Sequence, residues 1–342
     1  MKKFTFFLNK TIGSRKTYNE LVFIAALFFI PFIMIIIRPL NSTDTGGYYS
    51  YFTNPASASN VEQSFLLIAS LVRVISPELL GFRFLLFIYA FLSSVFLFVV
   101  LKKSENPFIA FIVYFSFAYI YQMCIQIRSG VANLIFVWAI YDIANKKPKQ
   151  YYLKMLLAFF FHNSSVLFFV LYPLARFFNK YRRMLVVLPF LFVFLSICLY
   201  FLMDQAIFLL SNSKVTMLKT LYAYTYIKQF SEAPVNPFNR ISLFLLFVYY
   251  FFLFLVKRKN TLEIVSLVIM AFSIFCYFLG KFTLPIISQR YPEAFNLILV
   301  ISLPLLYIRC KEKKIYFLLL LIYLLLINIQ YKTLSTMLSY VF

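Results

Sequence analysis

Long, uninterrupted apolar runs are the feature that most constrains the fold of this chain. Many of them reach about 17 to 21 residues, long enough for a helix to cross a hydrocarbon core roughly 30 Å thick. Only 13% of the 342 residues are charged, about half the share of an ordinary soluble domain. The sequence therefore predicts an all-α, polytopic integral membrane protein.

The apolar runs predict nine full membrane spans. Their expected positions are residues 21–38, 82–101, 107–124, 129–145, 184–203, 241–257, 261–281, 294–309 and 315–332. The first span follows a basic tail, residues 1–20, and ends without a small-residue cleavage site, so we expect an uncleaved signal anchor. Two further apolar segments, 62–76 and 151–178, do not have the length of a single span.

The segment 62–76 is predicted to lie along the outer membrane surface. It contains Arg73 and is short for a span. If it does not cross, Lys102 and Lys103 after the next span face the cytoplasm, where loops of membrane proteins carry an excess of Lys and Arg. We therefore expect an outer interfacial helix here.

The segment 151–178 is predicted to form a hairpin of two short helices. Basic residues precede it at 146–149 and follow it at 180–183. Both groups face the cytoplasm only if the segment enters the membrane and returns on the same side. We expect the turn near His162, and irregular backbone at that depth requires surrounding protein or water.

This topology is predicted for a single transmembrane domain covering residues 1–342. It places the tail 1–20 in the cytoplasm, large loops at 39–81 and 204–240 outside, and the C-terminus outside. About two thirds of the 33 Lys and Arg then lie on the cytoplasmic side, which is the expected bias. The first half of the second loop has apolar positions at helical spacing and is expected to lie along the outer interface.

Several classes of function are disfavoured. The net charge of +22 comes from short basic groups between apolar runs, so nucleic-acid binding is not indicated. The four cysteines form no C-x-x-C pair, and no two acids lie within ten residues of each other, so no zinc site or acidic magnesium cluster is implied. A G-x-S-x-G nucleophile is also absent. We expect a reaction without metal or cofactor on a membrane-bound anionic substrate.

Arg128 and His162 are unusual because a charge and an imidazole are costly at membrane depth. Arg128 is the only charged residue between Pro107 and Tyr141, and it begins a predicted span. A guanidinium beside free helix N–H groups favours an anion, although a snorkelling arginine is the alternative. His162 is the only histidine and can exchange protons near neutral pH, although it could also be a hydrogen-bonded core residue. The predicted hairpin places both in the outer half of the membrane.

Further candidates lie in or near the segments expected outside. Asp44 and Tyr48 form a D-x-x-x-Y element, which suggests a carboxylate that binds a sugar or accepts a proton, or alternatively a solvated turn. Glu62 suits the start of a helix, where a negative charge favours the dipole. Arg290 and Glu293 either form an ion pair at i, i+3 on a helix, or Arg290 supplies a second cation for the same anion as Arg128. The remaining candidates are Tyr51, Arg73, Arg83 and Gln126.

These candidates predict a common outer cavity. Seven of them map to the outer half in this topology: Asp44, Arg73, Arg83, Arg128, His162, Arg290 and Glu293. Arginines outnumber acids among them, so the cavity is expected to attract anions.

Several of these stretches resemble the EpsG family of Wzy-type polysaccharide polymerases. The matching features are Asp44-Thr-Gly-Gly-Tyr48, the segment that begins at Glu62, and a block that runs from Arg128 through a short basic loop to an A-x-x-F-H-x-S element at His162. A later Arg-Tyr-Pro-Glu-Ala-Phe stretch begins at Arg290. The resemblance covers about residues 40–300, and the block from Arg128 to His162 is its most specific part.

The resemblance implies polymerisation of glycan repeat units at the outer face of a bacterial inner membrane. Donor and acceptor are both carried on undecaprenyl pyrophosphate, and a separate chain-length regulator is a further partner that the resemblance allows. Cations near the leaving pyrophosphate would stabilise its charge, and a base would take the proton of the attacking hydroxyl. We expect the pyrophosphate to bind Arg128 and Arg290, with Arg73 and Arg83, and the base to be His162 or Asp44. The residues expected to contact the glycan are Tyr48, Tyr51, Glu62, Gln126 and Glu293.

Other functions stay open. An O-antigen ligase or another lipid-linked glycosyltransferase would share the anion site and differ in its acceptor. A flippase or transporter for lipid-linked sugars would more typically show paired broken helices, whereas the sequence indicates one broken segment. A membrane acyltransferase would use a histidine but leaves Arg128 and the D-x-x-x-Y element unexplained.

Overall fold

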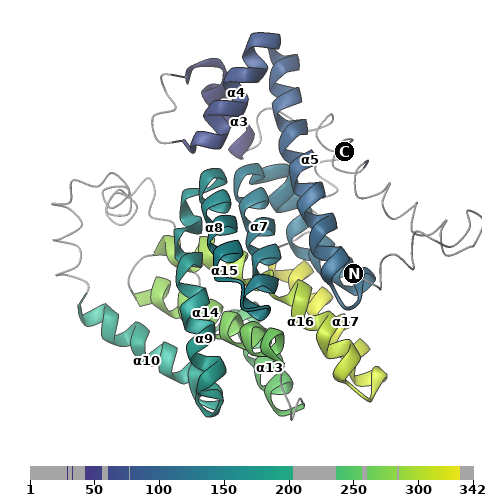
Figure 1. Cartoon of the computed structure of the whole chain (residues 1–342), viewed down its shortest axis with the longest axis vertical. Coiled ribbons are helices and arrows are strands. Elements are labelled where there is room, and N and C mark those ends of the chain that lie inside the picture. The colour runs from purple at the N-terminus through teal and green to yellow at the C-terminus, as the bar shows by residue number, and fades with distance from the viewer. Residues whose placement is uncertain are drawn as a thin grey trace, which may run out of the picture. The chain divides into compact units, whose positions relative to one another are not determined.

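The computed structural model describes residues 43–55, 61–76, 78–202, 236–255, 260–282 and 285–331, together with Phe29 and Ile33. Every regular element in these ranges is a helix, which confirms the all-α prediction (Figure 1). The predictions for the tail 1–20, the first span, most of the loop 204–240 and the C-terminus fall outside the described residues.

Four helical segments in the described ranges are long and apolar enough to cross a membrane, which supports a multi-pass membrane protein. They are Leu79–Lys103 (α5), Ile127–Ala144 (α7), Thr261–Lys281 within α14 (Thr261–Phe282), and Arg290–Arg309, which combines parts of α15 (Pro285–Asn296) and α16 (Leu299–Arg309). Shorter apolar helices are α4 (Gln63–Ile75), α10 (Leu188–Phe201) and α13 (Arg240–Leu255). The predicted count of nine spans is therefore not confirmed.

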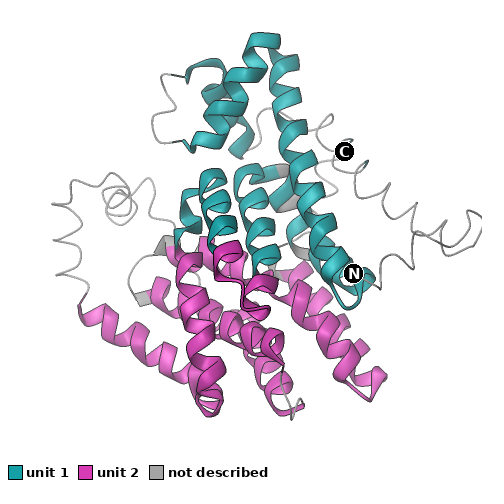
Figure 2. Ribbon diagram, viewed as in Figure 1, with its two compact units in different colours: residues 1–139, 152–166, 331–342 teal, residues 140–151, 167–330 magenta. Residues whose placement is uncertain are grey.

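The chain forms two compact units (Figure 2). Unit 1 contains residues 1–139, 152–166 and 331–342, and unit 2 contains residues 140–151 and 167–330. Because α7 and α8 (Pro148–Phe161) each contribute residues to both units, the unit boundaries do not coincide with linkers. The single transmembrane domain stays a prediction.

The first part of unit 1 is more regular than the sequence indicated. Residues Thr43–Thr53 form helix α3, so Asp44 and Tyr48 lie one turn apart on a helix and not in a turn. The following helix α4 is tied to α3 because Arg73 Nη1 donates a hydrogen bond to the carbonyl oxygen of Phe52 at 3.2 Å. Helix α4 buries Phe65 and neighbouring small residues on one side, whereas its opposite side is apolar and exposed. The placement of α4 along the outer membrane surface stays a prediction.

The predicted span 107–124 contains a change of helix type. Helix α6 (Pro107–Tyr114) is preceded by the N-cap residue Asn106, whose side chain accepts a hydrogen bond from the Ile109 N–H at 3.1 Å. From Phe115 to Ile125 the chain continues as a π-helix, η2. Helix α7 then begins at Ile127. A π-helix widens the turn and is frequent at functional sites, so the junction between η2 and α7 is a distinctive position in the chain.

Gly130 allows a close backbone approach at this junction. A Cβ atom built at Gly130 would lie 2.2 Å from the carbonyl oxygen of Gln122 in η2. Gly130→Ala is therefore expected to destabilise the protein by about 1–3 kcal/mol, because the backbone itself must shift. Gly47→Ala is the matched control, because a Cβ there meets no described atom within 4 Å and alanine favours a helix. Thermal unfolding of both purified variants in detergent checks this, and an unchanged melting temperature for Gly130→Ala would contradict it.

Unit 2 is organised around α14. This helix packs against α9 (Leu171–Lys180), α10, α13 and α15. Its buried Glu263 accepts a hydrogen bond from Arg309 Nε at 2.7 Å and another from the Asn260 N–H at 2.7 Å, so the buried charge is compensated. Unit 2 also contains η4 (Arg182–Val186) and α17 (Lys313–Tyr331), which covers most of the last predicted span.

The predicted reversal at His162 is present. Helix α8 is followed by the non-helical His162, the 3₁₀-helix η3 (Asn163–Val170) and α9. Near the start of α8, the hydroxyl of Tyr151 donates a hydrogen bond to the carbonyl oxygen of Phe168, and its ring lies 5.5 Å from that of Tyr172. The returning chain therefore meets the start of α8 again, although its first part is a 3₁₀-helix and not the expected α-helix.

Candidate functional site

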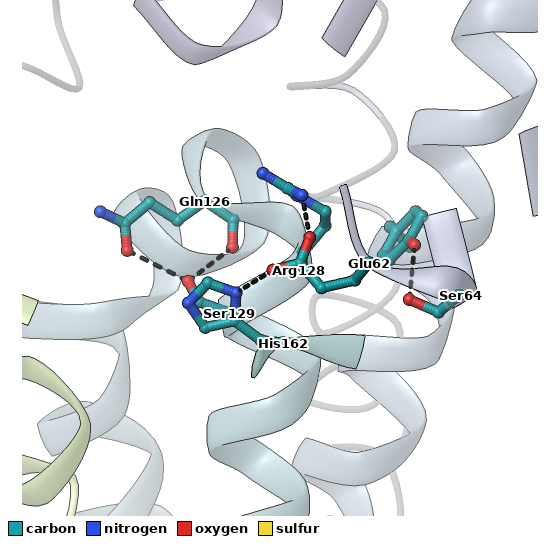
Figure 3. A network of polar contacts seen from close by, with 7 residues as sticks. Glu62, Ser64, Gln126, Arg128, Ser129 and His162 are labelled. Carbon is teal, nitrogen blue, oxygen red and sulfur yellow. Dashed lines mark hydrogen bonds and ion pairs between the residues drawn. The ribbon is translucent and has the colours of Figure 1, made fainter. Parts of the chain in front are cut away.

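The carboxylate of Glu62 joins Arg128 and His162 within unit 1 (Figure 3). One oxygen, Oε1, lies 2.6 Å from Nδ1 of His162. The other, Oε2, accepts a hydrogen bond from Nη1 of Arg128. Arg128 and His162, which were candidates for separate reasons, therefore both contact Glu62.

Each of these three residues stands where a helix begins or breaks. Glu62 is the N-cap residue of α4, with extended backbone, but its side chain makes no capping hydrogen bond. Arg128 is the second residue of α7, which begins two residues after the end of the π-helix. His162 is the non-helical residue between α8 and η3. Side chains at such positions can turn away from the helix surface and converge on one point.

The start of α7 is held by a local hydrogen-bond network. The hydroxyl of Ser129 donates to the backbone oxygen of Gln126 at 3.0 Å or to its side-chain Oε1 at 3.1 Å (Figure 3). Gln126 is buried. This residue was predicted to assist substrate binding, and in the structure its contacts fix the turn that presents Arg128.

Aromatic rings surround the guanidinium of Arg128. Its Cζ atom lies 5.0 Å from the ring centroid of Tyr48 and 5.8 Å from that of Phe65. Phe65 in turn lies 6.3 Å from the ring of Tyr89, whose hydroxyl is 3.3 Å from that of Ser64. A cation against aromatic faces is stabilised by their quadrupoles, and the low local dielectric strengthens its ion pair. The aromatic contacts therefore fix Arg128 in one orientation.

Burial differs among the three central side chains. The exposed fraction is 6% for Glu62, 18% for Arg128 and 25% for His162. Burial raises the pKa of Glu62, but the hydrogen bond with His162 and the charge of Arg128 lower it more, so the pKa lies below its ordinary value. Glu62 is consequently ionised at neutral pH. His162 is the most exposed member and the one best placed to meet a substrate.

The other predicted residues of α3 lie beside this centre. Tyr48 is buried beneath Arg128, and burial raises the pKa of its hydroxyl while the arginine charge opposes the shift. Asp44 is half-buried one turn earlier on α3, and its charge also raises the pKa of Tyr48. The ring of Tyr51 meets Phe65 edge-on at 6.5 Å. Tyr48 therefore packs against the cation, and its stacking on a sugar stays a prediction.

Of the four predicted arginines, Arg128 is the one that contacts Glu62 among the described residues of unit 1. Arg73 binds the carbonyl of Phe52, and Arg83 lies half-buried near the start of α5. Arg290 and Glu293 belong to α15 in unit 2, where the first is exposed and the second half-buried. The roles of these four residues stay predictions, as does a cavity rich in arginine. Among the described residues, no group of three His, Cys, Asp or Glu could hold a metal ion.

Comparison with known proteins shows which protein family the chain matches. The model of the EpsG family, whose members are Wzy-like polymerases, matches residues 21–342 and thus nearly the whole chain. No curated protein and no solved structure matches the chain. The family match therefore includes Glu62, Arg128 and His162 together.

Proposed function

The chain belongs to the EpsG family of Wzy-like polymerases, and on this premise we propose that it polymerises lipid-linked oligosaccharide repeat units at the outer face of a bacterial cytoplasmic membrane. The donor is a growing glycan on undecaprenyl pyrophosphate, and the acceptor is one repeat unit on the same lipid. Both substrates are delivered by the bilayer, so a site for a soluble sugar nucleotide is not needed.

The proposed reaction is a direct glycosyl transfer. A hydroxyl oxygen of the acceptor forms a bond to the anomeric carbon of the donor, while the bond from that carbon to the pyrophosphate oxygen breaks. The hydroxyl proton passes to Nε2 of His162, and negative charge grows on the leaving pyrophosphate. Arg128 stabilises that charge with N–H donors that its contact with Glu62 does not use. No metal is required for these steps.

The observation that carries the proposal is the meeting of Arg128 and His162 at one buried carboxylate. A cation for a phosphate and a base for a hydroxyl are the two groups that this transfer needs. A ligase that transfers finished glycan to a different acceptor would use the same pair, so it is the second candidate. A flippase requires neither a base nor a cation aimed at developing charge.

Purified protein in liposomes with a synthetic undecaprenyl-pyrophosphate repeat unit is expected to produce a ladder of glycans that differ by one repeat. The ladder is resolved by gel electrophoresis or mass spectrometry, and empty liposomes are the control. Transfer to an added non-repeat acceptor without a ladder would favour a ligase. Movement of the lipid across the bilayer without a new glycosidic bond would favour a flippase.

A further inference from the structure

Both oxygens of the Glu62 carboxylate are engaged. Oε1 contacts Nδ1 of His162 at 2.6 Å, and Oε2 accepts the hydrogen bond from Arg128. At 6% exposure Glu62 is the least accessible member of the three. It is therefore poorly placed to receive a proton from a substrate, and its position suits a role that acts through its two neighbours.

The contact with Glu62 also determines which nitrogen of His162 is free. An ionised carboxylate only accepts hydrogen bonds, so Nδ1 of a neutral imidazole beside it carries the proton. The lone pair then lies on Nε2, on the opposite side of the ring. A base held in one tautomer and orientation by a carboxylate is a general arrangement for activating hydroxyl groups.

We propose that Glu62 is the positioning residue of the site: it holds His162 as the Nδ1–H tautomer and, through its second oxygen, fixes the distance between the base and Arg128. This inference rests on the proposed function for the identity of the reaction but not for the tautomer itself. It assigns Glu62 a different role from the glycan contact that the sequence suggested.

Glu62→Gln separates this role from simple packing. The amide keeps the size of the side chain but has one oxygen and one NH₂ group, and it faces two donors. If the oxygen stays with Arg128, the NH₂ group faces the imidazole, which must then accept at Nδ1 and carry its proton on Nε2. Nε2 then has no lone pair to accept the substrate proton, so the base is lost although the histidine is present.

The tautomer can be observed directly because His162 is the only histidine in the chain. In protein labelled with ¹⁵N-histidine, we expect the nitrogen shifts of the Nδ1–H form above neutral pH for the wild type and of the Nε2–H form for Glu62→Gln. The same tautomer in both proteins would overturn the proposal. Because this measurement needs no substrate, its failure is distinct from failure of the proposed function, which is an absence of polymer with the wild type.

A double-mutant cycle provides the kinetic test. We expect Glu62→Gln to lower the polymerisation rate by at least about 10²-fold in the wild-type background, but by less than about 10-fold when His162 is already asparagine. Equal losses in both backgrounds would show that Glu62 does not act through His162. Glu78→Gln is the matched control, because Glu78 is also a helix N-cap without a side-chain capping bond and is exposed. Glu62→Asp, which keeps the charge but shortens the reach, is expected to restore part of the rate.

Discussion

Replacing Arg128 with alanine is expected to lower the polymerisation rate by about 10²–10³-fold and to destabilise the protein. The rate falls because the donor of hydrogen bonds to the leaving pyrophosphate is lost, and such donors contribute on the order of 10²–10³-fold each. Stability falls because Glu62 is left as a buried charge without its cation, which costs roughly 3–5 kcal/mol in a buried pair. The rate is measured from ladder formation, and stability from thermal unfolding in detergent.

Arg128→Lys separates these two effects. Lysine keeps the positive charge for Glu62, so stability should largely recover. Its single ammonium cannot bind Glu62 and a phosphate in the planar arrangement of a guanidinium, so the rate should stay at least about 10-fold low. Arg182→Lys is the matched control, because Arg182 is exposed and hydrogen-bonds locally to Asn179 at 3.2 Å. A normal ladder from Arg128→Ala would exclude the pyrophosphate role.

Charge patterns in the sequence predicted the reversal at His162, for a clear physical reason. Lys and Arg stay on the cytoplasmic side, so the basic groups before and after residues 151–178 require the chain to return. The contact between Tyr151 and Phe168 confirms that it does. The same rule cannot predict helix type, and the π-helix before Arg128 and the 3₁₀-helix after His162 depend on packing and not on composition.

Sequence patterns named Arg128, His162 and Glu62 as candidates but did not predict that Glu62 joins the other two. Glu62 lies far from both along the chain, and its position before an apolar helix fits a helix-dipole role equally well. A signal was nevertheless available: a buried cation and a buried imidazole each need a partner, and the chain contains only 11 acids. Pairing them requires the tertiary fold, because no spacing rule connects α4, α7 and the end of α8.

Replacing His162 with asparagine tests its role as the base. The substitution keeps the hydrogen bond to Glu62 and removes the proton acceptor. The amide nitrogen of asparagine occupies about the position of Nδ1, so it can still donate to Glu62, but it provides no base. His162→Asn is expected to fold normally, to bind the donor lipid with nearly unchanged KM, and to lower kcat by about 10³-fold, within the usual range for general-base catalysis.

Two further variants complete the test of the base. Asn163→Ala, at an exposed neighbour, is the control for disturbance of the turn and should leave the ladder unchanged. Asp44→Asn addresses the alternative base on α3, because Asp44 is half-buried one turn from Tyr48. If Asp44→Asn lowers kcat by about 10³-fold while His162→Asn leaves it nearly unchanged, the proton acceptor is Asp44 and His162 only contacts Glu62. The opposite outcome assigns the proton to His162, because a carboxylate that does not accept the proton contributes little to kcat.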